Sequence, residues 1–135
     1  IAAPDHPLAS RKALSAADLA EELFISREEG SGTRILMTRY LDRIGDGQVF
    51  RMVEMGSNET IKQSVIAGLG IAFLSLHTVT EELTQGRLIL LQAPQLPILR
   101  HWFLVNIATR YQSPASEEIA RNIVALNASY LPKLP

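Results

Sequence analysis

Residues 23–34 have the sequence LFISREEGSGTR, in which a short apolar run leads into a glycine-rich turn. The apolar run has the length of a buried β-strand, and Gly30 and Gly32 permit a tight turn after it. We therefore expect a strand, a turn and then a helix that ends at the glycines 45 and 47. Apolar residues support the helix because they recur at helical spacing, at positions 36, 37, 40, 41 and 44.

The same order of elements is repeated directly afterwards. A strand is expected at 49–55, and Gly56-Ser57 then opens a second helix that runs from Asn58 to about Ala67. A buried strand at 71–74 follows it. Strands and helices in alternation predict an α/β fold with a mostly parallel sheet.

Shorter elements are expected on either side of this central part. Ser15 and Asp18 match a capping box, which opens a short helix through Glu22. Ser113-Pro114 marks the start of a last helix, which runs to about Ala128. The remaining expected elements are the tail of a strand at 1–3, a short helix at 77–83, strands at 88–91 and 100–107, and a crossing between two lobes at the prolines 94 and 97.

Two of the helix starts form the candidate binding site. Each follows a strand directly, so a parallel sheet brings both to the edge outside the carboxyl ends of its strands, where open α/β sheets bind ligands. Free backbone N–H groups at a helix start attract anions, and an arginine there adds a charged fork. We therefore expect a small anionic or polar ligand, held by residues of the two starts: Gly30, Ser31, Gly32, Thr33, Arg34, Ser57 and Asn58.

Each of these residues also has a purely structural interpretation. Ser31 and Ser57 can serve only as helix caps, for which serine is favoured everywhere. Arg34 can be a solvated helix residue that pairs with Glu28 or Glu29. The three residues His-Trp-Phe at 101–103 can line a ligand pocket or, alternatively, belong to the core and the edge of the sheet.

Other side chains in this region have simpler predictions. Met52 and Met55 are expected to fill the core. Lys62 and Gln63 are expected on the solvated side of their helix, since the apolar stripe of that helix lies elsewhere, at positions 61, 65 and 66.

Composition and missing motifs exclude several kinds of function. The 135 residues carry 13 basic and 14 acidic side chains, a net charge of −1, whereas a domain that grips nucleic acid usually has a basic surplus. The chain has no cysteine and only three scattered histidines, which argues against a metal site. The P-loop, the dinucleotide-binding pattern and the hydrolase elbow are absent. We therefore expect no enzyme, no cofactor and no direct contact with DNA.

An ordered set of short motifs resembles the LysR-type transcriptional regulators. The motif REEGSGTR at 27–34 is similar to that family's "RE.GSGTR", and SNETIK at 57–62 followed by AGLGIA at 67–72 is similar to its "SNEaIK…aGLGIa". The segment PILRHW at 97–102 resembles the branch of the family that controls carbon-fixation genes. Further pieces in family order are PDHPLA at 4–9, LSAADLA at 14–20, EL at 82–83 with GRL at 86–88, and SPA at 113–115.

The resemblance implies a type 2 periplasmic-binding-protein-like effector domain with two Rossmann-like lobes. Residues 1–4 are then an inter-lobe crossover strand, 5–98 the second lobe, and 99–135 the return strand and last helix of the first lobe. The family's N-terminal winged helix-turn-helix, which binds DNA, is absent from this chain. A small effector in the cleft between the lobes shifts how such a regulator grips its promoter.

The expected partners follow from this resemblance. They are an anionic or phosphorylated metabolite, DNA only through the missing domain, and other copies of the protein in a dimer or tetramer, in the cytoplasm and without a membrane. The main alternative is a solute-binding protein of a transporter, which shares the fold. An α/β enzyme and a plain interaction module without a ligand are further alternatives.

Overall fold

The computed structural model describes residues 1–107, 109, 111–127 and 129–132, and the chain divides into two units. Unit 1 comprises Ile1–Leu96, and unit 2 comprises the described residues from Pro97 onward. The three strands found among the described residues lie in unit 1: β1 (Leu23–Ser26), β2 (Arg51–Glu54) and β3 (Ile71–Ala72). They form a parallel sheet in the order β2-β1-β3, which confirms the predicted fold class.

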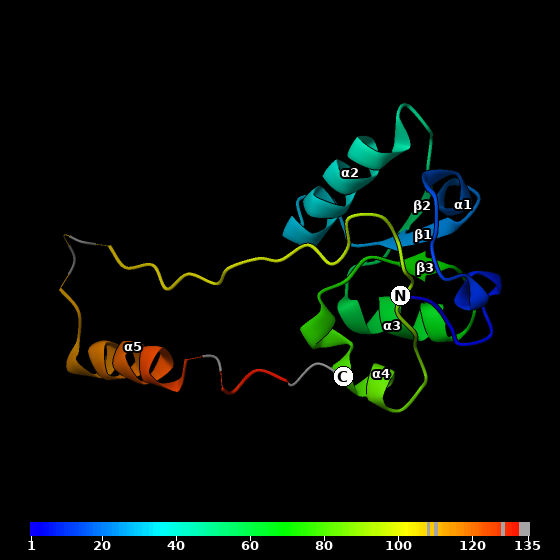
Figure 1. The fold of residues 1–135 in the computed structure, drawn as a ribbon. Coiled ribbons are helices and arrows are strands. Elements are labelled where there is room, and N and C mark those ends of the chain that lie inside the picture. Colours follow the sequence, from blue (N-terminus) through cyan, green and yellow to red (C-terminus); the bar gives the residue numbers. More distant parts are fainter. Residues whose placement is uncertain (108, 110, 128, 133–135) are drawn as a thin grey trace. The chain divides into compact units, whose positions relative to one another are not determined.

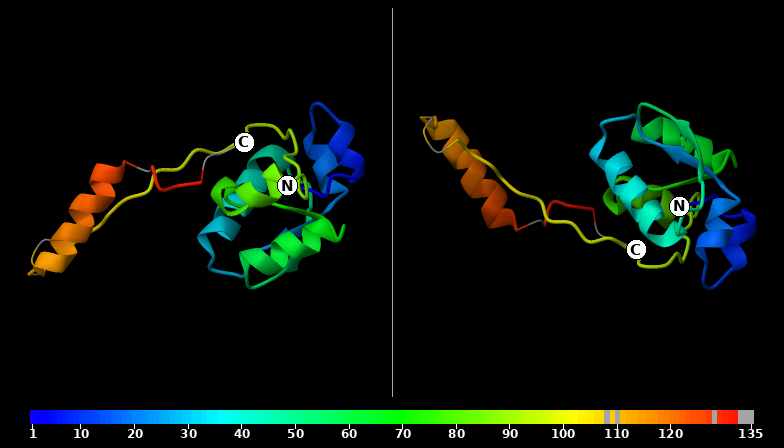
Figure 2. Two further views of the ribbon diagram at one scale, coloured as in Figure 1. Left: turned by 90° about the horizontal axis from the view of Figure 1, so that it is seen from below. Right: turned by 90° about the horizontal axis from the view of Figure 1, so that it is seen from above.

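Two helices connect the strands and cover opposite faces of the sheet. Helix α2 (Gly32–Gly45) leads from β1 to β2, and α3 (Asn58–Ile66) leads from β2 back across β1 to β3. Right-handed crossovers that run in opposite directions across a sheet place their helices on opposite faces. Figure 1 shows this arrangement, with α2 on one side of the sheet and α3 on the other, and the views in Figure 2 agree with it.

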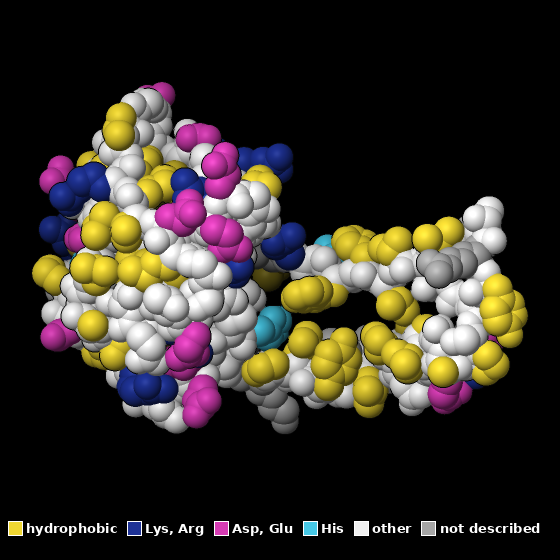
Figure 3. Space-filling view, turned by 180° about the vertical axis from the view of Figure 1, so that it is seen from behind, with side chains coloured by type: hydrophobic (Ala, Val, Ile, Leu, Met, Phe, Trp, Pro, Cys, Tyr) yellow, Lys and Arg dark blue, Asp and Glu magenta, His cyan; other side chains and the backbone are white. Residues whose placement is uncertain are grey.

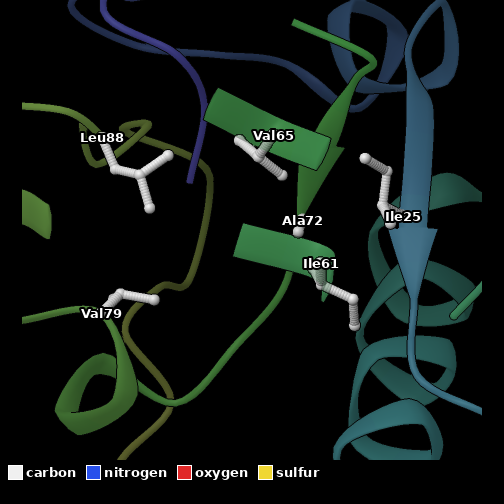
Figure 4. Packing of buried hydrophobic residues seen from close by; sticks show 6 residues of the cluster. All are labelled: Ile25, Ile61, Val65, Ala72, Val79 and Leu88. Carbon is white, nitrogen blue, oxygen red and sulfur yellow. The ribbon is translucent and has the colours of Figure 1, made fainter. Parts of the chain in front are cut away.

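The core on the α3 face consists of aliphatic side chains. Ile25 of β1 is fully buried there and meets Ile61 and Val65 of α3. Figure 4 shows how side chains from β1, α3, β3 and the segments after β3 gather in this core. The complete cluster is Ile25, Ile61, Val65, Ala72, Val79 and Leu88.

The α2 face has an aromatic core. Successive strand residues point to opposite faces, so Phe24 of β1 lies on the side away from Ile25 and packs edge-on against Phe50, with ring centroids 5.8 Å apart. Tyr40 of α2 stacks on Phe73 at 5.7 Å, and its hydroxyl donates a hydrogen bond of 3.0 Å to the carbonyl of Pro94. The end of unit 1 is thereby fastened to α2.

Close backbone packing between β1 and β3 depends on Gly70. A Cβ atom at this position would lie 2.2 Å from the carbonyl oxygen of Leu23. The residue before β3 must therefore be glycine, because a side chain would push the two strands apart.

Smaller elements flank the sheet. A 3-10 helix (Pro7–Ser10) precedes α1 (Ala16–Ala20), which opens with the predicted capping box of Ser15 and Asp18. After β3 come a second 3-10 helix (Leu76–Thr78) and α4 (Thr80–Thr84).

A buried ion pair fastens α4 to α3. The ammonium of Lys62 lies 2.8 Å from the carboxylate oxygens of Glu82 and of Glu59, and Glu82 is only 4% exposed. The hydrogen bond from Lys62 holds the pKa of Glu82 below its ordinary value. The prediction that Lys62 is solvated was therefore wrong, although Gln63 is exposed as predicted.

Several predicted boundaries in unit 1 were wrong. The strand expected at 49–55 is limited to β2, and its Met52 is partly exposed instead of filling the core. The strands expected at 1–3 and 88–91 reduce to one antiparallel bridge, Ala2 with Ile89. The helix expected at 77–83 is divided between the second 3-10 helix and α4.

Unit 2 contains α5 (Pro114–Leu126), which begins as predicted with Ser113 as N-cap and Pro114 in the first turn. The strand expected at 100–107 is not formed, because none of its backbone pairs with another strand among the described residues. Trp102 and Phe103 are each 80% exposed, so they belong neither to a core nor to a sheet edge. Figure 3 shows many hydrophobic side chains on the visible face of this unit.

No helix within the described residues has the length and apolar character to span a membrane. In the same part of the chain no group of three or more His, Asp or Glu side chains is placed to hold a metal ion.

Candidate functional site

The two predicted helix starts lie at one edge of the sheet. Strands β1 and β2 are parallel neighbours, and their last residues, Ser26 and Glu54, are paired in register. Helix α2 begins six residues after the end of β1, and α3 begins four residues after the end of β2. Both starts therefore follow the carboxyl ends of adjacent strands, which is where the sequence places the candidate site.

The start of α3 is closed by its own cap. The hydroxyl oxygen of Ser57 accepts a hydrogen bond of 3.1 Å from the backbone N–H of Thr60, and it lies 2.8 Å from the Thr60 hydroxyl. Glu59 adds a carboxylate in the first turn. The side chain of Ser57 therefore acts as a helix cap in this structure, as its structural interpretation predicts.

The start of α2 differs from that of α3. Gly30 precedes it with a φ of +84°, and Ser31 is the N-cap residue but makes no side-chain capping bond. Gly32, Thr33 and Arg34 form the first turn, which contains no acidic residue. The first amides of α2 thus have neither a serine hydroxyl nor a local carboxylate to satisfy them, and such a start favours an external anion.

Arg34 links the ends of the two strands. Its Nη1 donates hydrogen bonds to the Ser26 hydroxyl at 3.0 Å, to the Arg27 carbonyl at 3.1 Å and to the Glu54 carboxylate at 3.1 Å. Ser26 is 1% exposed, so one of these bonds reaches into the interior. The alternative pairing of Arg34 with Glu28 or Glu29 was wrong, since its ion pair is with Glu54, and the Nη1 bonds connect the ends of β1 and β2.

Arg27 is a charged residue of this edge that the sequence argument did not single out. Its Nε and Nη2 each donate a hydrogen bond of 2.6 Å to the carboxylate of Glu28, and its Nη1 donates one of 2.8 Å to the side-chain oxygen of Asn58. The pairing raises the pKa of Arg27 and lowers the pKa of Glu28. Its place directly after β1 was the available signal, because residues at that place face the ligand edge of a parallel sheet.

Asn58 therefore serves as a tie between the two helix starts. It is the first residue of α3, and Arg27 connects it to the loop before α2. The structure brings the predicted residues of both starts to one edge through this tie and through Arg34.

An open hollow of about 310 Å³ lies beside α2. Two of the predicted residues, Gly30 and Arg34, take part in its lining, whereas Ser31 and Ser57 do not. Its lining is Glu29, Gly30, Arg34, Ile35, Thr38 and Arg39.

The chain is similar to known proteins over most of its length. The family model of the LysR substrate binding domain matches residues 1–126. The HTH-type transcriptional regulator CbbR of Cereibacter sphaeroides is 57% identical over 135 residues, which are 100% of this chain and 44% of that protein. The RuBisCO operon transcriptional regulator of Allochromatium vinosum is 47% identical over 117 residues, 86% of this chain and 38% of that protein. The chain thus spans less than half the length of these relatives.

Solved structures show the same fold. The regulatory domain of CcmR from Synechocystis PCC6803, in complex with 2-PG, superposes with a TM-score of 0.84 at 35% identity and covers 96% of this chain and 62% of that one. The effector binding domain of QuiR in complex with shikimate, at 19% identity, superposes with a TM-score of 0.76 over 97% of this chain and 61% of that one, which supports the periplasmic-binding-protein-like fold alone. The chain belongs to the LysR substrate binding domain family.

Proposed function

We propose that this chain is the effector-sensing part of a LysR-type transcriptional regulator. The observation that carries the proposal is the uncapped start of α2, which lies beside the start of α3 at the ligand edge of the sheet. Membership of the family supports it, and the matched relatives are named as transcriptional regulators, which favours a regulator over a transporter's solute-binding protein.

The proposed effector is a small anionic metabolite, phosphorylated in the simplest case. Three observations support an anion: the free amides at the start of α2, the absence of an acid from its first turn, and the guanidinium groups of Arg27 and Arg34 at the same edge. The related regulatory domain of CcmR was solved with 2-PG. The proposed ligand residues are those of the two helix starts: Gly30, Ser31, Gly32, Thr33, Arg34, Ser57 and Asn58.

In this proposal the effector acts by shifting populations. A ligand that contacts both lobes of an effector domain stabilises the closed state relative to the open one, and only this difference in free energy moves the equilibrium. The shift then passes to DNA through the winged helix-turn-helix domain of such a regulator. Residues 1–4 serve as the crossover strand, 5–98 as the second lobe and 99–135 as a part of the first. The protein acts in the cytoplasm as a homo-oligomer, without catalysis and without a cofactor.

The boundary between the units supports this lobe assignment. The division of the chain at Leu96 and Pro97 falls within two residues of the proposed lobe boundary. The exposed apolar side chains of unit 2 are also what a part of a lobe presents when most of that lobe lies elsewhere.

Calorimetry with a metabolite panel that includes 2-PG, on the full-length protein, tests the proposal. Ser31→Ala is expected to weaken effector binding about tenfold, because a hydroxyl that bonds a charged group contributes on the order of 1.5 kcal/mol. Ser10→Ala, which removes an exposed hydroxyl of the first 3-10 helix, is the matched control and leaves the affinity unchanged. An effector that binds wild type and Ser31→Ala equally well would show that the site lies elsewhere.

A further inference from the structure

The guanidinium of Arg27 is already paired with a carboxylate of the protein itself, that of Glu28. We propose that Glu28 occupies the position on Arg27 that an acidic group of the effector takes, so that binding requires Glu28 to leave. The proposal rests on the proposed function, since it concerns the same sheet edge. It adds a residue that recognises the effector and an internal competitor that sets its affinity.

The geometry of the pair is that of ligand recognition. Two parallel N–H groups of Arg27, Nε and Nη2, donate to the two oxygens of the Glu28 carboxylate at 2.6 Å each. This is the bidentate fork by which arginine binds carboxylates and phosphates. A carboxylate or phosphate group of similar width therefore fits the same two donors.

The fork stays in place when Glu28 leaves. The third donor of Arg27, Nη1, is bonded to the side-chain oxygen of Asn58 at 2.8 Å. Asn58 belongs to α3, so Arg27 remains anchored to the second helix start. The side chain of Arg27 is 22% exposed, which leaves it reachable from solvent.

Glu28 lies at a part of the edge from which its side chain can turn into solvent. It lies in the loop between β1 and α2, two residues before Gly30 with its φ of +84°. Its side chain is 39% exposed, and within the described residues Arg27 is the only side chain to which its carboxylate bonds. Ion pairs of this exposure contribute little net free energy, so a ligand with several contacts at the edge displaces Glu28 readily.

The test compares two neighbouring carboxylates. Glu28→Gln removes the competitor, and Glu29→Gln is a matched control because Glu29 is exposed and forms no ion pair in the described part of the chain. Calorimetry on the full-length protein uses 2-PG and inorganic phosphate as probes. Glu28→Gln is expected to tighten binding about two- to fivefold, because the ligand no longer has to break an exposed ion pair, whose free energy corresponds to a change of this size. Glu29→Gln is expected to have the smaller effect of a lost distant charge.

A second measurement follows Glu28 directly in the wild-type protein. Carboxyl carbon chemical shifts give its pKa by titration, and in the free protein the pKa is expected below its ordinary value, because Arg27 donates to it. Saturation with the bound probe is expected to raise the pKa toward the ordinary value, as the carboxylate returns to water. Arg27→Lys keeps the charge, lacks the fork and is expected to weaken binding.

The outcomes separate this inference from the proposed function. If the wild type binds a probe but Glu28→Gln and Glu29→Gln behave alike, or if the pKa of Glu28 stays low at saturation, the inference fails and the sensor proposal stands. If neither the wild type nor Glu28→Gln binds any probe or metabolite, both fail. Binding of a probe to Glu28→Gln but not to the wild type would support the proposal that Glu28 competes with the effector for Arg27.

Discussion

Lys62 and Glu82 form the most consequential polar contact at the scale of single residues. The carboxylate of Glu82 is 4% exposed, and its Oε2 has no hydrogen-bond partner among the described residues, so Lys62 compensates most of the buried charge. Arg87 lies 3.6 Å from the same carboxylate and adds a weaker contact. The polar contact between α3 and α4 therefore depends mainly on the ammonium group of Lys62.

Lys62→Met is expected to lower the free energy of unfolding by about 2–3 kcal/mol, because it leaves a buried charged acceptor without its main partner. Urea denaturation measures this loss. The double variant Lys62→Met/Glu82→Leu is the control, since removing both partners is expected to recover much of the stability. A single variant as stable as the wild type would contradict the buried pair.

The same pair predicts a dependence on pH. Because the pKa of Glu82 is lowered in the folded state, its contribution is complete above the ordinary value of 4.5 and is lost as the pH falls through the lower folded pKa. Urea denaturation at a series of acid pH values is expected to show this loss in the wild type. The variant Glu82→Gln is expected to lose less stability over the same range.

At the scale of elements, the two helix starts are expected to respond differently to the loss of their serines. Ser57→Ala removes a hydrogen bond to the Thr60 N–H and is expected to cost about 1 kcal/mol of stability. Ser31→Ala removes no capping bond and is expected to stay within about 0.5 kcal/mol of the wild type. Thermal or urea unfolding of both variants checks the difference, and equal losses would show that Ser31 caps α2 after all.

Elements with local signals could be predicted from the sequence. Strand β1 and helices α2 and α3 follow from apolar runs, helical spacing and glycine-rich turns, and their order fixes a parallel sheet. The prediction of a strand at 100–107 was wrong because a strand is stable only beside a partner strand. The alternation of residues within a segment does not show whether such a partner is present. Local pattern likewise does not show that the side chain of Lys62 reaches α4.

The candidate site was predictable in its position but not in its bonding. The place of Ser31 and Ser57 at one sheet edge follows from topology, which the order of strands and helices largely determines. Which serine caps its helix, and which acid Arg34 binds, depends on side-chain rotamers and on residues that come together only in the folded chain. The role of Arg27 was not predictable for the same reason, since its partner Asn58 lies 31 positions away in the sequence.

At the scale of the whole molecule, unit 2 is expected to be covered in a longer protein. The regulatory domain of CcmR extends beyond the part that this chain matches, because the chain covers 62% of it. Exposed apolar side chains along 99–107 and on α5 then find partners in the rest of the first lobe. This expectation follows from the proposed lobe assignment.

Trp102 reports on this covering, because it is the only tryptophan in the chain. In the 135-residue chain it is 80% exposed, so its fluorescence is expected at long wavelength and open to quenching by acrylamide. In a protein that also contains the rest of the effector domain, the emission is expected to move to shorter wavelength and the quenching to fall. Identical spectra would contradict the assignment of 99–135 to the first lobe.

The bridge between Ala2 and Ile89 has a practical consequence. Their backbones exchange two hydrogen bonds, of 3.1 and 2.9 Å, so the first residues of unit 1 and a segment close to its end run side by side. A module whose two ends meet can be inserted into a loop of another protein without stretching either of them. Residues 1–96 are thus suited to insertion as one continuous segment into a loop of another protein.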